Sequence, residues 1–344
     1  MEAVRDCIDR VDATLAAEHF DPQRPRLLDP TVLEEQRERW RAGDADLERV
    51  VGRLIVAADS VRGGRHESLA AATEAVAVLG LAGFLTRRGA YLAGCVDVVR
   101  TRFLNRRSRL DPQQWHGHGL HYLPDLARFL DREAALTSAE VARLRLWLEE
   151  HREWLEGSDE AAIRRSALDQ DGTWYDAVTA AIDSYLGDLP ALLATLRRTH
   201  ERIGQQFEPD GRQLVGLTEP ATVDHKLANL QGWVTLATFA AHTGQDLWAY
   251  RSHDGRSLVA VVQAMLQDLE AMGQPRRQES LDADRMRVIA LAAADYLPAA
   301  ASGHRTNPYG LRQLYPASSG IRPFWVLGGA PTWVAPLTGQ PQVG

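Results

Sequence analysis

The chain of 344 residues lacks the features that mark several common classes of protein. It has two cysteines, Cys7 and Cys95, which are too few for a disulfide framework or a cysteine-rich metal site. We therefore expect two reduced thiols, with Cys95 buried. No block rich in lysine and arginine stands out and the net charge is -7, so we expect no nucleic acid and no anionic membrane as partners.

Long apolar runs are also missing. No stretch approaches the roughly 20 uninterrupted apolar residues that span a bilayer. The start of the chain, 1–10, is polar and has no basic segment followed by an apolar one, which a secretory signal would need. These absences predict a cytoplasmic protein outside the membrane.

Motifs for cofactors and for covalent catalysis are absent as well. The sequence shows no glycine-rich phosphate loop between a strand and a helix, no Gly-x-Ser-x-Gly and no Cys/His nucleophile pattern. We therefore expect no cofactor and a small-molecule substrate as the partner. The sequence leaves the oligomeric state open.

The chain does have a helical period of 3.6 residues in almost every segment. In the stretch 137–154, Val141, Leu144 and Leu148 recur at three- and four-residue steps, and Thr137 with Glu140 forms a capping box. No strand alternation is visible, so the predicted fold class is all-α, a stack of helical hairpins. Further helices are expected at about 3–18, 44–61, 67–86, 90–103, 122–131, 173–186, 189–206, 224–243, 257–272 and 282–296.

The composition changes along the chain and suggests three parts. Residues 1–29 are predicted to form an N-terminal helix and linker, and residues 30–297 the helical domain. After Leu297 the sequence is rich in proline, glycine, serine and aromatic residues and loses its helical period. Residues 298–344 are therefore predicted to be a coil that packs on the domain.

One run of residues resembles the signature of a known family. Asp171-Gly-Thr-Trp-Tyr-Asp176 is similar to the Asn-Asn-His-Gly-Thr-Trp-Tyr-Asp signature of the alginate lyases, polysaccharide lyases built as an incomplete α/α toroid. The resemblance covers about 66–287 and implies an α/α toroid-like fold. Other matching elements follow in the family's order, namely Thr86, Tyr91, 100–104, 208–211, Gln213, 229–230 and 246–257.

The sequence departs from the family where its chemistry should lie. By the resemblance, an Asn-His pair before the glycine holds the substrate carboxylate neutral, but Gln170 and Asp171 stand here, after Asp169. The family's Gly-Arg-Gly element matches 117–119, with His118 in place of arginine. The family's aromatic, sugar-binding N-terminal segment has no recognisable counterpart.

A second set of departures follows the 208–211 turn. Counting from that turn, the family's two arginines fall near Glu219 and Ala221, and its proton-transferring tyrosine falls on His225. An anionic uronate would then face carboxylates instead of cations. Each like-charge pair at about 4 Å costs roughly 4 kcal/mol at an effective dielectric constant near 20, so we expect alginate to be excluded.

The rewritten positions still hold acids and bases. Clustered carboxylates next to a histidine can supply the acid and the base of an elimination. The resemblance thus implies a lyase or dehydratase acting on a small, non-anionic molecule, in a biosynthetic pathway. The predicted catalytic residues are Asp169, Asp171, Asp224 and His225. The predicted substrate-binding residues are Gln170, Trp174, Tyr175, His118, His121, Trp115 and Glu219.

Structural explanations compete with several of these roles. Asp171 is also a suitable N-cap for a helix that begins near Thr173. Trp174 and Tyr175 fit a structural role better than a catalytic one, and Tyr175 is the better candidate of the two for lining a cavity. His225 is also compatible with a solvated helix end.

Other functions also stay open. His116, His118 and His121 could bind zinc with Asp125, although their spacing matches no standard site. The carboxylates could instead start a proton-initiated cyclisation or isomerisation, as in class II terpene cyclases. Finally, a family member without its catalytic residues could be a ligand-binding pseudoenzyme.

Overall fold

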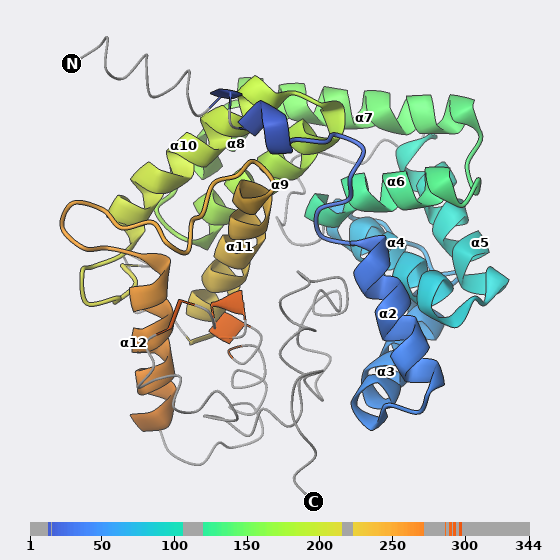
Figure 1. Ribbon diagram of the computed structural model, residues 1–344. Coiled ribbons are helices and arrows are strands. Elements are labelled where there is room, and N and C mark those ends of the chain that lie inside the picture. The colour runs from blue at the N-terminus through green and yellow to red at the C-terminus, as the bar shows by residue number, and fades with distance from the viewer. Residues whose placement is uncertain are drawn as a thin grey trace, which may run out of the picture. The chain divides into compact units, whose positions relative to one another are not determined.

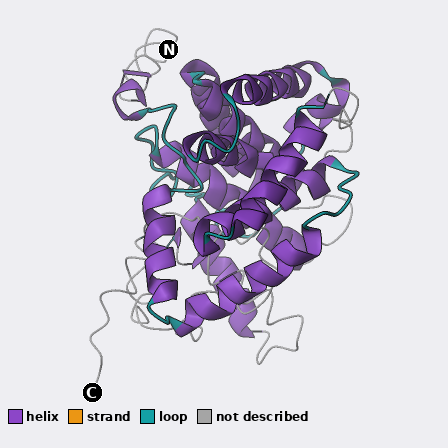
Figure 2. Ribbon diagram, turned by 90° about the vertical axis from the view of Figure 1, so that its right-hand side faces the viewer, coloured by secondary structure: helices purple, strands orange, loops and turns teal. Residues whose placement is uncertain are grey.

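The computed structural model describes residues 13–14, 16–105, 120–214 and 223–271, and scattered positions between 286 and 297. In these ranges all regular structure is helical, and the bridge between Phe207 and Gln213 is isolated (Figures 1 and 2). The all-α prediction is therefore confirmed. The predicted helices 3–18 and 282–296 lie mostly outside the described residues, and the coil 298–344 lies wholly outside them.

The chain divides into two compact units, each of which we name after its central helix. The α4 unit comprises Leu27–Trp154 and Met272–Gly344, and the α9 unit comprises Met1–Arg26 and Leu155–Ala271. The domain boundaries predicted at residues 30 and 297 stay predictions.

The α4 unit is built around the apolar helix α4 (Leu69–Thr86), which contacts α2, α3, α5 and α6. This helix is long and apolar enough to cross a membrane, but 78% of it is buried within the protein, as in the core helix of a folded domain. Cys95 is fully buried, as predicted, and burial raises the pKa of its thiol to about 12. The surrounding helices are α2 (Pro30–Arg41), α3 (Ala45–Val61), α5 (Gly89–Val98), the π-helix η1 (Val99–Phe103), η4 (Leu120–Tyr122), α6 (Leu123–Arg132) and α7 (Ser138–Gly157).

The amino end of α7 is fixed by the predicted capping box. Glu140 accepts a hydrogen bond from the Thr137 backbone N–H at 2.9 Å, and Thr137 Oγ1 accepts one from the Glu140 N–H at 3.3 Å. Glu140 also binds the guanidinium of Arg100 through two bonds of 2.7 and 3.2 Å. These bonds lower the pKa of Glu140 to about 2 and tie the π-helix η1 to α7.

The α9 unit is built around α9 (Gln170–Leu186), which contacts α8, α10 and α11. Because α9 has neighbours on several sides, every residue from 172 to 184 is buried. The other helices are α8 (Asp159–Ser166), α10 (Leu189–Gln206), α11 (Val223–Ala241) and α12 (Leu258–Ala271).

Most of the described helices match their predictions, and α10 matches at both ends. Helices α2 and α8 were not predicted, because neither shows a clear helical pattern of apolar residues. Helix α2 buries the polar Gln36 and Arg37, and α8 has one fully buried residue, Ala161. The alternative in which Asp171 caps a helix beginning near Thr173 was wrong. Asp169 is the N-cap, and its Oδ1 accepts a hydrogen bond from the Asp171 N–H at 2.9 Å.

The helix can begin this early because of Gly172. A Cβ at Gly172 would collide with the carbonyl oxygen of Ala167 and with the guanidinium of Arg202, which lie against this residue. Arg202 in turn is 2% exposed and donates to the carbonyl oxygens of Arg165 and Ala167. The first turn of α9 therefore packs directly on the end of α8 and on α10.

This packing predicts opposite effects for two glycines. Gly172→Ala should destabilise the protein by about 1–3 kcal/mol, because backbone atoms must move to admit the methyl group. Gly204→Ala, in α10, should stabilise it by roughly 0.5–1 kcal/mol, because no atom lies within 4 Å of the new Cβ. Urea unfolding followed by circular dichroism measures both values. Equal effects would contradict the described packing.

A buried histidine on α7 makes the stability of the α4 unit dependent on pH. His151 is 4% exposed, and its ring stacks between Trp147 and Trp154 at centroid distances of 5.2 and 5.6 Å. Burial lowers its pKa from 6.5 to about 4. Between these two pH values the unfolded chain holds a proton that the folded chain does not.

Stability should therefore be greatest above pH 6.5 and should fall as the pH drops toward 4, with up to ~3 kcal/mol lost through His151. His151→Phe should keep an aromatic ring in the stack and remove this part of the loss. Unfolding free energies of parent and variant at several pH values test the prediction, and parallel curves between pH 4 and 6.5 would refute it.

Candidate functional site

A buried network of hydrogen bonds joins three helices at the carboxyl end of α10. The last residue of that helix, Gln206, donates from Nε2 to the carbonyl oxygen of Asp169 at 2.9 Å and to Thr173 Oγ1 at 3.0 Å. Its Oε1 accepts from Trp233 Nε1 at 3.0 Å and from Asn229 Nδ2 at 3.2 Å. Thr173 Oγ1 donates to Asn229 Oδ1 at 2.6 Å. One amide thus binds the first turn of α9 and the first half of α11.

The turn that follows α10 extends this network. Gly211 has φ +85°, which favours glycine, and its N–H donates to the Glu208 carbonyl at 2.9 Å. The turn brings Gln213 back to α11, where its Oε1 accepts from Asn229 Nδ2 at 3.1 Å. Arg256 reaches the same place and donates to the Phe207 carbonyl at 2.8 Å. Several elements that carried the family resemblance, namely the turn at 208–211, Gln213, Asn229 and Arg256, therefore meet at the end of α10.

The signature run on α9 also makes internal contacts. Trp174 is 5% exposed and donates from Nε1 to the Ala228 carbonyl at 3.1 Å, and Tyr175 is 2% exposed and donates to the Leu155 carbonyl at 2.9 Å. Asp176 is fully buried and pairs with Arg198 at 2.7 Å and Arg202 at 2.8 Å. Trp174, Tyr175 and Asp176 thus hold the helices of the α9 unit together.

The candidate catalytic residues lie at the rim of this network. Asp169 and His225 are each four residues, or about one helical turn, before Thr173 and Asn229, whose side chains are hydrogen-bonded. Asp171 lies beside Asp169 in the first turn of α9, is exposed, and pairs with Arg164 at 3.6 Å. His225 is also exposed. The structure therefore brings the amino ends of α9 and α11 to one place.

The other candidate residues on α9 and α11 are Asp224, Asp169 and Gln170. Asp224 belongs to α11, but its side chain lies outside the description. Asp169 keeps one carboxylate oxygen beyond the one that caps the helix. Gln170 has a buried Oε1 for which the described residues offer no hydrogen-bond partner. It is the one predicted substrate-binding residue on α9 whose polar group is not used for packing.

The predicted substrate-binding residues away from α9 are mostly undescribed. His118, Trp115 and Glu219 lie outside the described residues. His121 is 3% exposed in the α4 unit, with its ring 4.2 Å from that of Tyr122. Burial places His121, like Trp174 and Tyr175, in the core of its unit, so we do not retain these three side chains as substrate contacts.

The possible zinc site rests on residues that only partly belong to the description, since His116 and His118 lie outside it. Asp125 already uses both carboxylate oxygens. Oδ2 accepts from the N–H groups of Leu27 at 2.5 Å and Leu28 at 2.9 Å, and Oδ1 accepts from Arg128 at 2.7 Å. Among described residues no group of three or more potential ligands is arranged to hold a metal.

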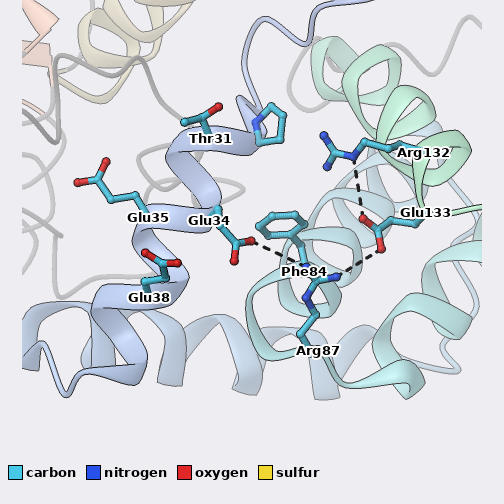
Figure 3. Close-up of a pocket in the computed structure, with 9 residues that line it drawn as sticks. Thr31, Glu34, Glu35, Glu38, Phe84, Arg87, Arg132 and Glu133 are labelled. Carbon is cyan, nitrogen blue, oxygen red and sulfur yellow. Dashed lines mark hydrogen bonds and ion pairs between the residues drawn. The ribbon is translucent and has the colours of Figure 1, made fainter.

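A separate cavity of about 580 Å³ lies in the α4 unit, between α2 and the ends of α4 and α6 (Figure 3). Its two arginines pair with its glutamates: Arg87 with Glu34 at 3.8 Å and with Glu133 at 3.4 Å, and Arg132 with Glu133 at 4.0 Å. None of the predicted site residues lines it, and α2, which supplies several of its lining residues, was not predicted.

Comparison with known proteins defines the family. The alginate lyase family model matches residues 59–277, and the chain therefore belongs to the alginate lyase family. An alginate lyase from Bacteroides ovatus is 19% identical, with a TM-score of 0.69 over 85% of this chain and 98% of that one. Alginate lyase A1-III from Sphingomonas species A1 is 16% identical, with a TM-score of 0.47 over 63% and 67% of the two chains. No curated protein sequence matches the chain.

These comparisons confirm the resemblance and the predicted fold class, an all-α, α/α toroid-like stack of helical hairpins. Membership of the family supports a lyase-like function. The Bacteroides ovatus structure shows the shared fold alone, because its identity to this chain is low.

Two carboxylates of the signature run should differ in their effect on stability. Asp176→Asn should cost about 3 kcal/mol or more, because it leaves the buried guanidinium of Arg202 without its charged partner. Asp171→Asn should change stability by no more than about 1 kcal/mol, because its ion pair is exposed. Chemical unfolding of the two variants measures the contrast, and comparable losses would show that Asp171 is also a structural residue.

Proposed function

We propose that this chain is a lyase or dehydratase that acts on a small, non-anionic molecule by acid–base elimination. Asp171 and His225 would be the acid–base pair, assisted by Asp169 and Asp224. The observation that supports the pair most is that two exposed groups, a carboxylate and an imidazole, stand at the amino ends of helices joined by one buried network. Family membership supports elimination as the type of reaction.

The preference for a non-anionic substrate follows from charge. A uronate carboxylate at this rim would meet Asp169 and Asp171, and Arg164, the cation described beside Asp171, already pairs with it at 3.6 Å. Repulsion of roughly 4 kcal/mol per close pair would weaken binding of an anion, whereas an uncharged substrate avoids it. Alginate is for this reason not the proposed substrate. A cytoplasmic biosynthetic reaction is the setting that we propose.

The proposal can be tested with one sugar chain in two charge states. Oligomannuronate and its methyl ester have the same ring and linkage, but the ester has no negative charge and keeps the acidic C5 proton. We expect the ester to yield an unsaturated product, seen by its ultraviolet absorbance, and the free acid to yield none. Asp171→Asn should slow the reaction by about 100-fold or more, the usual contribution of general acid–base catalysis.

The controls separate the alternatives. Asp210→Asn, on the turn after α10, should leave turnover unchanged, because Asp210 only accepts the N–H of Arg212 at 3.0 Å. Faster cleavage of the free acid than of the ester would refute the non-anionic substrate. Binding of the ester without turnover would instead support a ligand-binding pseudoenzyme. A rearranged product of unchanged mass would support an isomerase or cyclase.

A further inference from the structure

The network at the end of α10 joins two helices through a single side chain, that of Gln206. Gln206 uses the two ends of its amide on two different helices. Its Nε2 donates to α9, at the Asp169 carbonyl and Thr173, and its Oε1 accepts from Asn229 and Trp233 of α11. Thr173 Oγ1 also lies within hydrogen-bond distance of Oε1, at 3.2 Å. A planar amide has a fixed distance between these atoms, so it constrains the spacing of the two helices together with the direct bonds from Thr173 to Asn229 and from Trp174 to Ala228.

The residue that carries this amide is itself held from several sides. Gln206 is fully buried, and its carbonyl oxygen accepts the N–H of Leu214 at 2.8 Å. Phe207, the next residue, is fully buried, and its carbonyl accepts from Arg256 at 2.8 Å. The anchor therefore has little freedom to follow a movement of α9 or α11.

The groups proposed to do chemistry lie outside the network but on the same two helices. Asp171 lies two residues before Thr173, and His225 four residues before Asn229. Both side chains are exposed, and their separation depends on how the two helices that carry them are spaced.

We propose that Gln206 is the positioning residue of the candidate site: its amide fixes the amino end of α9 relative to that of α11, and so sets the separation of Asp171 and His225. The role of those two groups rests on the proposed function, but the spacing of the helices does not. Misplacement of reacting groups by about 1 Å can lower a rate by about 100-fold, so the spacing would matter for turnover.

The spacing can be measured without a substrate. Spin labels at Leu168→Cys, just before α9, and Lys226→Cys, in the first turn of α11, report the distance between the two helix ends by pulsed electron paramagnetic resonance. Cys7→Ser removes one of the two native thiols, and the other, Cys95, is fully buried. We expect one narrow distance distribution in the otherwise unchanged chain.

Gln206→Met keeps the length of the side chain and removes both ends of the amide. We expect a broadened or shifted distribution in this variant. Gln36→Met is the matched control, because Gln36 is a buried glutamine in the other unit, and it should keep the narrow distribution. Should Gln206→Met fail to fold, Trp233→Phe removes one bond to Oε1 and should move the distribution in the same direction.

A folded Gln206→Met protein with lowered stability and an unchanged distribution would overturn the proposal, because Gln206 would then only stabilise the fold. If the methyl ester is turned over, Gln206→Met should lower kcat by about 100-fold and change KM little. If the parent turns nothing over, the proposed function fails, while the distance measurement still decides the role of Gln206.

Discussion

The hydrogen bonds of one buried amide, that of Gln206, are the interaction on which the α9 unit depends. They satisfy the buried indole N–H of Trp233 and join it to Thr173 and Asn229, which also bond to each other. An unsatisfied buried group costs about 1–3 kcal/mol, so such a network is stable only when its members are all in place. This requirement fixes where α9 begins, where α10 ends and how α11 passes them.

The same network connects the segments in which the chain resembles its family. The signature run, the turn at 208–211, Asn229 and Arg256 are far apart in the sequence, yet they contact the end of α10 or each other. These residues define a framework. Asp171 and His225, the positions at which we expect the chain to depart from its family, lie exposed at the rim of that framework. A fold can therefore be retained while the chemistry at its rim changes.

Local pattern was sufficient to predict much of the fold. The capping box of Thr137 and Glu140, the bounds of α10 and the burial of Cys95 all follow from spacing and residue type within a few turns. Helix α2 was missed because it buries Arg37, whose guanidinium lies 5.4 Å from the ring centre of Phe84 in α4. This contact with Phe84 comes from another helix, so the spacing of apolar residues in α2 does not reveal it.

The candidate site was less predictable, for the same reason. Asp169 and Asp171 are equivalent as N-caps by residue type, and the structure has Asp169 as the N-cap of a first turn in which Gly172 lies against Arg202. Trp174 and Tyr175 donate to backbone carbonyls 54 and 20 residues away, so their burial could not be deduced from the helical period. The order of the motifs in the sequence identified the acid and base candidates, but long-range contacts determine which of them are exposed.

We propose that Asp171 and His225 form an exposed acid–base pair over this buried framework. A crystal structure that includes residues 215–222 and the Asp224 side chain would test it most directly. We expect the Asp171 carboxylate and the His225 imidazole to border one cavity, within reach of a common small molecule. A structure in which they face separate regions of solvent, with no cavity between them, would contradict it.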